Sequence, residues 1–309
     1  MRIGTRGSPL ALAQAGTVAE LLGEDAELVP IVTSGDRASA AAPASDAPQD
    51  KERWVKELEL ALLAGEVDLA VHSAKDVPSE LPDGLELVGS PRRGDPFDAL
   101  VGADSLAALP VGARVGTASP RRAAQLRALR EDLVVTEVHG NVGTRLRLLA
   151  DGALDALVLA VAGLQRLGLR SRVGCVLAEL VPAAGQGTLV LQARAGDEHA
   201  RAMARSITDA ATWDALCAER TLVAGLHASC HTPLGAHATI AHDGIVLRTF
   251  AGLPDGSQWL RDVTPPAPGP REAGELAARR LLAAGAAELL RLAAELATSG
   301  DPPPAARTR

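Results

Sequence analysis

Cysteine is scarce in this chain of 309 residues, and the three cysteines do not form a recognisable site. Cys175, Cys217 and Cys230 show neither the paired spacing of a structural metal site nor the pattern of a disulfide framework. Because free thiols persist in reducing compartments, we expect a cytoplasmic protein.

Long apolar runs are also missing, since no stretch is long enough to span a bilayer. Met1 and Arg2 lead directly into a predicted strand, so we expect neither a signal peptide nor a membrane partner. The net charge of −7 argues against general binding to nucleic acids. With 47% hydrophobic residues, the chain is typical of a folded protein with two or three domains.

Lysine is rare as well, because it occupies only positions 51, 56 and 75 among 31 lysine and arginine residues. The simplest explanation is a GC-rich genome, which favours codons for arginine and alanine. In that background, a lysine that is kept weakly indicates that an ammonium group is needed at its position.

Two segments of the chain, beginning at Arg2 and Arg114, follow the same plan. Each contains a strand ending in Gly-Thr, a turn, a serine suited to cap a helix and a proline at the first helical position, with arginine nearby. A second match follows, because Gly65–Asp68 and Gly152–Asp155 each precede an apolar run. We therefore predict two similar α/β domains, with helix N-termini and arginines around an anion-binding cleft between them.

The stretch Leu69–Pro82 combines an apolar run with a polar cluster. The run Val67–Val71 predicts a buried strand, and Pro78 ends any regular element after it. Between them lie His72, Ser73, Lys75 and Asp76. Charged residues just past a buried strand are typical of sites in open α/β sheets. From this stretch alone a solvated surface turn is slightly favoured, and the rest of the chain reverses that preference.

A glycine-rich turn at Val138–Arg145 joins a predicted strand end to a predicted helix, again with arginine in the first turn. It matches neither the P-loop nor the dinucleotide-binding pattern, so it does not indicate a nucleotide site. Ala38–Asp50 has no periodicity and predicts a mobile loop. In the last third we predict a helix over Trp213–Gly225 and a long helix over Glu272–Ala297.

Cys230 lies in a predicted loop, Leu226–Gly235, between two histidines. Four interpretations remain open from the residues alone: an inert thiol, a metal ligand, a nucleophile paired with histidine, and a thiol that holds a prosthetic group. A metal site would use His227, His231 and His237 with Cys230. For Cys175 and Cys217, which lie in apolar surroundings, we expect inert buried thiols.

Several segments together resemble the porphobilinogen deaminase (hydroxymethylbilane synthase) family. Any one of them is a weak signal, but all of them occur in order and at the right separations. They are Thr5–Leu12, Ala70–Pro78, Gly116–Arg122, Gly140–Arg145, Leu159–Gly168, Gly185–Gly187 and Cys230–Gly235.

The resemblance implies a transferase of tetrapyrrole and haem biosynthesis that condenses four porphobilinogen molecules, with loss of ammonia, into hydroxymethylbilane. It implies a dipyrromethane cofactor held by a thioether to Cys230, and a cytoplasmic monomer without a nucleic-acid or membrane partner. The implied fold has two α/β domains similar to periplasmic binding proteins and a smaller α+β domain. The expected boundaries are 1–92 with 188–206 for the first domain, 96–182 for the second, 210–298 for the third and 299–309 for a disordered tail.

The resemblance also assigns roles to single residues of this sequence. Asp76 is implied as the catalytic carboxylate, with Lys75 as its neighbour. The residues implied to hold the cofactor are Cys230, Arg121, Arg122, Ser119, Thr117, Arg145, Asp76 and Lys75, and those implied to bind substrate are Arg6, Ser8, Arg166, His139 and Lys51.

This chain departs from the family pattern at a few of these positions. His139 stands where an arginine usually precedes the glycine-rich turn, and Lys51 is the single lysine kept where the family often has two. Trp54 occupies the place of the usual phenylalanine. A different class of function, a non-catalytic anion-binding protein, would need the arginines but neither Asp76 nor a reactive Cys230.

Overall fold

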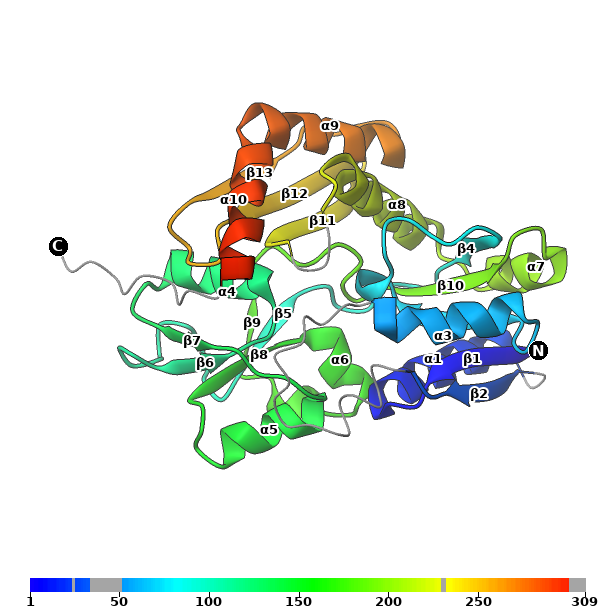
Figure 1. Cartoon of the computed structure of the whole chain (residues 1–309), viewed down its shortest axis with the longest axis horizontal. Coiled ribbons are helices and arrows are strands. Elements are labelled where there is room, and N and C mark those ends of the chain that lie inside the picture. Colours follow the sequence, from blue (N-terminus) through cyan, green and yellow to red (C-terminus); the bar gives the residue numbers. More distant parts are fainter. Residues whose placement is uncertain (24–25, 34–51, 229–231, 300–309) are drawn as a thin grey trace.

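The computed structural model describes residues 1–23, 26–33, 52–228 and 232–299. These residues form three β-sheets with helices packed against them (Figure 1). The Ala38–Asp50 segment, Lys51, Cys230 and the tail from residue 300 lie outside the described residues. No helix in the described ranges is long and apolar enough to cross a membrane.

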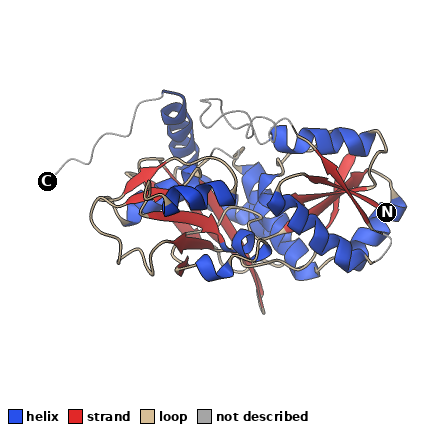
Figure 2. Cartoon of the chain, turned by 90° about the horizontal axis from the view of Figure 1, so that it is seen from below, coloured by secondary structure: helices blue, strands red, loops and turns tan. Residues whose placement is uncertain are grey.

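The first sheet is built from both the beginning and the middle of the chain. Its strands, in spatial order, are β2 (Glu27–Ile31), β1 (Arg2–Arg6), β3 (Leu69–Ser73), β10 (Leu189–Arg194) and β4 (Leu85–Gly89). Helices lie on both sides of it (Figure 2), and they are α1 (Pro9–Leu22), α3 (Glu52–Leu63) and α7 (Glu198–Ser206). A short 3-10 helix, η1 (Ala74–Asp76), follows β3 directly.

The second sheet repeats this arrangement. Its strands are β7 (Val134–Thr136), β6 (Arg114–Gly116), β8 (Ala156–Ala160), β5 (Asp98–Val101) and β9 (Cys175–Leu177). Its helical elements are α4 (Pro120–Leu129), α5 (Val142–Ala150), α6 (Val161–Arg166) and η2 (Arg170–Arg172). In both sheets the first three strands are parallel and the fourth runs antiparallel to its two neighbours.

The repeat extends to individual hydrogen bonds. The Arg2 backbone N–H donates to Asp68 at 2.8 Å, and its guanidinium donates to the Gly65 carbonyl at 2.9 Å. Arg114 makes the same two contacts, to Asp155 at 2.7 Å and to Gly152 at 2.9 Å. The predicted correspondence between the two segments is therefore confirmed at the level of side chains.

The third sheet is smaller and entirely antiparallel. It consists of β11 (Leu234–Ala241), β12 (Gly244–Gly252) and β13 (Trp259–Val263), packed against α8 (Ala210–Gly225), α9 (Pro270–Ala283) and α10 (Ala286–Ser299). The predicted fold class, two similar α/β domains with a smaller α+β domain, is confirmed. The single helix predicted over Glu272–Ala297 is wrong, because Gly285 adopts a φ of +97° and ends α9.

Glu219, on α8, joins the third sheet to the two segments that connect the first two sheets. Its buried carboxylate pairs with Arg93 at 2.7 Å and accepts hydrogen bonds from the backbone N–H groups of Gly185 and Ala238. Such a buried charge is tolerated because every one of these donors compensates for lost hydration.

Candidate active site

The helices α1 and α4 begin in the same way, as the sequence predicts. The Ser8 hydroxyl accepts a hydrogen bond from the Ala11 backbone N–H, and Ser119 accepts one from Arg122. In each helix a proline occupies the first turn, where it has no N–H to leave unsatisfied. Thr117 lies just before α4 and accepts a hydrogen bond from the Ser119 backbone N–H.

Asp76 and Lys75 lie in η1, immediately after the buried strand β3, and both are half-buried. Two contacts hold this turn against the returning chain. The Ala74 backbone N–H donates to the Thr188 carbonyl, and a Cβ added at Gly185 would lie 2.9 Å from Ala74. Since Gly185 also has a φ of +72°, only glycine allows this close approach.

Because β1 and β3 are parallel, their carboxyl ends meet at one edge of the first sheet. Arg6 ends β1, and its positive charge contributes to lowering the pKa of His72, on β3. The negative charge of Asp76 acts on the same imidazole. The structure therefore brings Arg6 and Asp76 together around the end of β3.

Arg121 and Arg122 share one buried carboxylate, Asp98, which the sequence analysis did not single out. Their guanidinium groups lie 2.9 and 2.7 Å from its oxygens, and Gln186 also donates to it at 2.9 Å. Burial by itself would raise the pKa of Asp98, but the two arginines and Gln186 hold that pKa well below its usual range. Asp98 lies in a strand whose every residue is buried, and a charged residue in such an apolar strand is the signal that could have found it.

Two arginines against one aspartate leave an excess positive charge at the start of α4. Arg121 also donates to the Val181 carbonyl at 2.6 Å, while its buried Nε atom has no hydrogen-bond partner in the described part of the chain. Arg122 donates to the Val158 carbonyl at 3.0 Å. These arginines are fixed in place, and an acceptor that reaches them would gain from the remaining charge.

Arg145 and Arg166 are half-buried, and within the described part of the chain each donates to a backbone carbonyl. Arg145 donates to Gly140 at 2.9 Å and Arg166 to Gly187 at 2.7 Å. Burial lowers the pKa of each guanidinium to about 10, and the charge of Arg122 contributes at Arg145. Within residues 1–23, 26–33, 52–228 and 232–299, no carboxylate contributes to the pKa of either guanidinium.

The two arginine-bearing units touch near these side chains. α1 contacts α6, and the two helices lie side by side (Figure 1). A Cβ at Gly94 would lie 3.6 Å from the Arg166 guanidinium, and Gly187, which accepts from Arg166, precedes β10. Arg166 therefore sits where the second unit meets the chain segments that lead into and out of it.

His139 occupies a different environment from the arginines. Its side chain is 41% exposed, and Nε2 lies 3.2 Å from a carboxylate oxygen of Glu137. His139, which stands where the resemblance leads us to expect an arginine, thus has an acidic partner, Glu137, in the same unit. Among the described residues, Arg145 and Arg166 have no such partner.

The described elements on either side of Cys230 are α8 and β11. α8 ends at Gly225, and His227 adopts a φ of +48°, which turns the chain out of the helix. On the other side, in β11, the Ala236 backbone N–H donates to the Pro182 carbonyl at 2.8 Å. Cys175 and Cys217 are half-buried, and burial raises the pKa of both thiols, which makes them poor nucleophiles.

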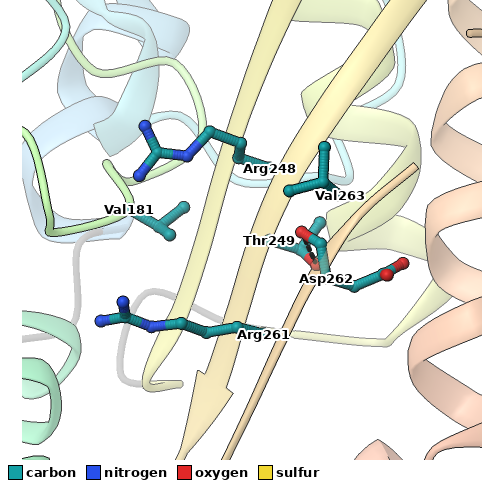
Figure 3. A pocket seen from close by; sticks show the side chains of 6 residues that line it. All are labelled: Val181, Arg248, Thr249, Arg261, Asp262 and Val263. Atoms are coloured by element: carbon teal, nitrogen blue, oxygen red, sulfur yellow. Dashed lines mark hydrogen bonds between the residues drawn. The ribbon is translucent and has the colours of Figure 1, made fainter. Parts of the chain in front are cut away.

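A cavity of about 360 Å³ lies elsewhere, between the third sheet and Val181. Arg248 and Arg261 project into it from β12 and β13 (Figure 3), while Asp262 at its edge pairs with Arg280. None of the predicted site residues lines it. Charge and hydrogen bonding, rather than the size of a cavity, therefore point to the site at the strand ends.

Comparisons with known proteins agree with this arrangement. Residues 1–202 match the family model of the porphobilinogen deaminase dipyrromethane cofactor binding domain, and residues 213–283 match that of the porphobilinogen deaminase C-terminal domain. The porphobilinogen deaminase of Deinococcus radiodurans is 44% identical over 303 residues, covering 93% of this chain and 97% of that protein.

Two solved structures that are similar to this chain are more distant in sequence. Immunogenic lipoprotein A from Vibrio vulnificus is 14% identical, with a TM-score of 0.44 over 69% of this chain and 96% of that one. A nutrient binding protein from Burkholderia cenocepacia bound to methionine is 13% identical, with a TM-score of 0.41 over 68% and 92%. On the two family matches and the 44% identity, the chain belongs to the porphobilinogen deaminase family.

Proposed function

We propose that this chain is a transferase that condenses four porphobilinogen molecules head to tail, releases ammonia at each step and forms hydroxymethylbilane. The family matches over both parts of the chain support this reaction. Each pyrrole of the substrate carries an acetate and a propionate, so the growing chain is a polyanion. Arginine suits such a ligand because it binds carboxylates through two parallel hydrogen bonds and does not lose its charge.

The observation that carries the proposal is the pair of half-buried cations, Arg145 and Arg166, that have no carboxylate partner among the described residues. Placing a cation away from water costs free energy unless an anion compensates for it. A ligand with several carboxylates would supply that compensation. We assign carboxylate binding to both arginines, with Arg6 and Ser8 contributing from the first unit.

The family implies a dipyrromethane cofactor, and the residues present fit it. Its carboxylates match the excess charge around Asp98 and the Nε atom of Arg121, which has no hydrogen-bond partner among the described residues. When bound, the cofactor supplies the pyrrole carbon from which the chain is extended. We propose that it is attached to Cys230 and held by Arg121, Arg122, Ser119, Thr117, Arg145, Lys75 and Asp76.

Asp76 is the proposed catalytic residue, with Lys75 beside it. Loss of ammonia from porphobilinogen leaves a cationic azafulvene, and a carboxylate near the pyrrole N–H groups stabilises that charge. The same carboxylate can accept and return a proton. The position of Asp76, half-buried at the end of β3 and close to His72 and Arg6, supports this role.

The test is turnover of porphobilinogen by the purified chain, followed as ammonia release and bilane formation. Intact mass should show two linked pyrrole units on the wild type and none on Cys230→Ser. A chain that binds porphobilinogen without adduct or turnover would instead be a non-catalytic anion-binding protein. As the resemblance implies, we also propose that the protein is a monomer and acts in the cytoplasm, and that Lys51 and His139 contact the substrate. Size-exclusion chromatography tests whether the protein is a monomer.

A further inference from the structure

His72 lies on β3, which leads into the proposed catalytic residue Asp76, and it is one end of a series of hydrogen-bonded side chains. Its imidazole Nε2 lies 2.9 Å from Oε1 of Gln192, on the neighbouring strand β10. The Gln192 Nε2 atom donates in turn to Oε1 of Glu59, on α3, at 3.1 Å. The His72 and Gln192 side chains are buried, so water does not compete for the bond between them, while Glu59 is half-buried.

Glu59, at the other end of the series, determines which group donates in each of these hydrogen bonds. A carboxylate only accepts hydrogen bonds, so Glu59 requires the NH₂ group of Gln192 to point toward it. The Gln192 oxygen must then face His72, and the imidazole Nε2 must carry the proton. In a neutral imidazole this leaves Nδ1 without a proton.

Charged groups on three elements act on the His72 ring, two of them directly and one through Gln192. Asp76, on η1, favours the imidazolium form and Arg6, on β1, opposes it, while Glu59, on α3, bonds to Gln192. Burial outweighs both the hydrogen bond to Gln192 and the attraction of Asp76, which favour the charged form, and lowers the pKa of His72 to about 4. His72 is therefore neutral at physiological pH.

We propose that Gln192 and Glu59 are positioning residues that fix the proton of the buried His72 ring on Nε2, on the strand that leads into Asp76. A proton on Nδ1 instead would reverse the dipole of the imidazole, and with it the field that the ring exerts on the Asp76 carboxylate, whose charge acts on this ring. A fixed tautomer therefore gives Asp76 one defined electrostatic environment. The catalytic consequence rests on the proposed function, whereas the tautomer itself can be measured without turnover.

The experiment combines nitrogen NMR of the histidine rings with kinetics. In the wild type, with His72→Gln to assign the signals, we expect an Nε2–H imidazole that does not titrate between pH 5 and 8. In Gln192→Met, which keeps the length of the side chain but cannot hydrogen-bond, both tautomers should appear. The kcat should fall roughly 10-fold with little change in KM, similar to the loss when a histidine's outer partner is removed in metal sites.

Gln125→Met is the matched control, because Gln125 is equally buried and bonds only to residues 121 and 181. It should lose a similar amount of thermal stability without changing the His72 signals. If Gln192→Met does not fold, Glu59→Gln tests the same link, since an amide can donate or accept and no longer orients Gln192.

Three results would overturn the proposal: an Nδ1–H tautomer in the wild type, a protonated His72 at pH 7, or an unchanged kcat in Gln192→Met. Failure of the proposed function looks different, because the wild type would then show the expected tautomer but no turnover.

Discussion

The first and second sheets are two versions of one scaffold in which a charged residue of one unit stands where the other unit has an uncharged one. In the register of the strands, Leu189 lies opposite Ser73 in the first sheet, and Asp98 lies opposite Ala160 in the second. After the capping serines and their prolines, α1 continues with Leu10-Ala11 and α4 with Arg121-Arg122. Uncharged residues in the first unit are thus replaced by an ion cluster in the second.

The reverse holds after the third strand of each unit. β3 leads into η1, which carries Asp76, whereas the corresponding position after β8 is Gly163. The first unit supplies the acid and the second supplies most of the cations. The comparison teaches that the scaffold sets where side chains meet, and that a few substitutions at strand ends set what they do.

The largest effect is expected from Asp98→Asn, which leaves Arg121 and Arg122 buried beside a neutral amide. Removing one partner from a buried ion cluster typically costs about 3–5 kcal/mol of unfolding free energy. Urea unfolding measures this loss. The triple variant Asp98→Leu, Arg121→Leu, Arg122→Ala copies the first unit and should recover most of the stability while losing cofactor binding; a triple variant as unstable as Asp98→Asn would contradict the comparison.

The same cluster predicts how stability depends on pH. The pKa of Asp98 is lower in the folded protein than the value of about 3.9 in an unfolded chain. Its contribution is therefore fully present above about pH 4 and is lost as pH falls toward the folded-state pKa. Unfolding measured from pH 6 to pH 2 should show a steeper loss for the wild type than for the triple variant.

Asp76→Asn should lower kcat about 100- to 1000-fold, because the amide keeps the size of the side chain but not the charge that stabilises a cation. The cofactor should still be attached, which intact mass would show. Asp83→Asn, an exposed carboxylate in the same unit, is the control and should keep full activity. Near-normal turnover of Asp76→Asn would show that Asp76 is not the catalytic carboxylate of the first unit.

Arg145→Gln and Arg166→Gln should each weaken substrate binding roughly 10-fold, as expected for a charge-assisted hydrogen bond. The loss should appear in KM or as stalled intermediates, and the salt dependence of binding should decrease, because one screened interaction is gone. Arg147→Gln, exposed on the same helix as Arg145, should behave like the wild type in both measurements. Equal effects at all three positions would show that burial of the cation is irrelevant.

The smallest effect is expected at His139. Because its side chain is exposed and paired with Glu137, His139→Gln should change kcat/KM by about threefold or less, in line with exposed ion pairs. His139→Arg restores the residue usual in the family and tests whether a permanent cation there improves affinity. A loss as large as that of Arg145→Gln would show that His139 contributes as much to substrate binding as the half-buried arginines do.

The amino-acid sequence by itself determined the features that depend on neighbouring residues. The serine caps at Ser8 and Ser119, the polar turn after β3 and the repeat of Arg2 and Arg114 could all be predicted, because capping, proline placement and apolar runs act over a few positions. The break at Gly285 was missed, since alanine and leucine on both sides favour a continuous helix.

Only the tertiary structure decided which distant side chains meet. Asp98 becomes the partner of Arg122 because β5 runs antiparallel beside β8, and Gln192 reaches His72 because the chain returns to the first sheet as β10. Glu59, which is 133 positions from Gln192 in the sequence, completes this series of hydrogen-bonded side chains. Local propensities carry no information about such pairings, because strand order and register are set by packing of the whole sheet.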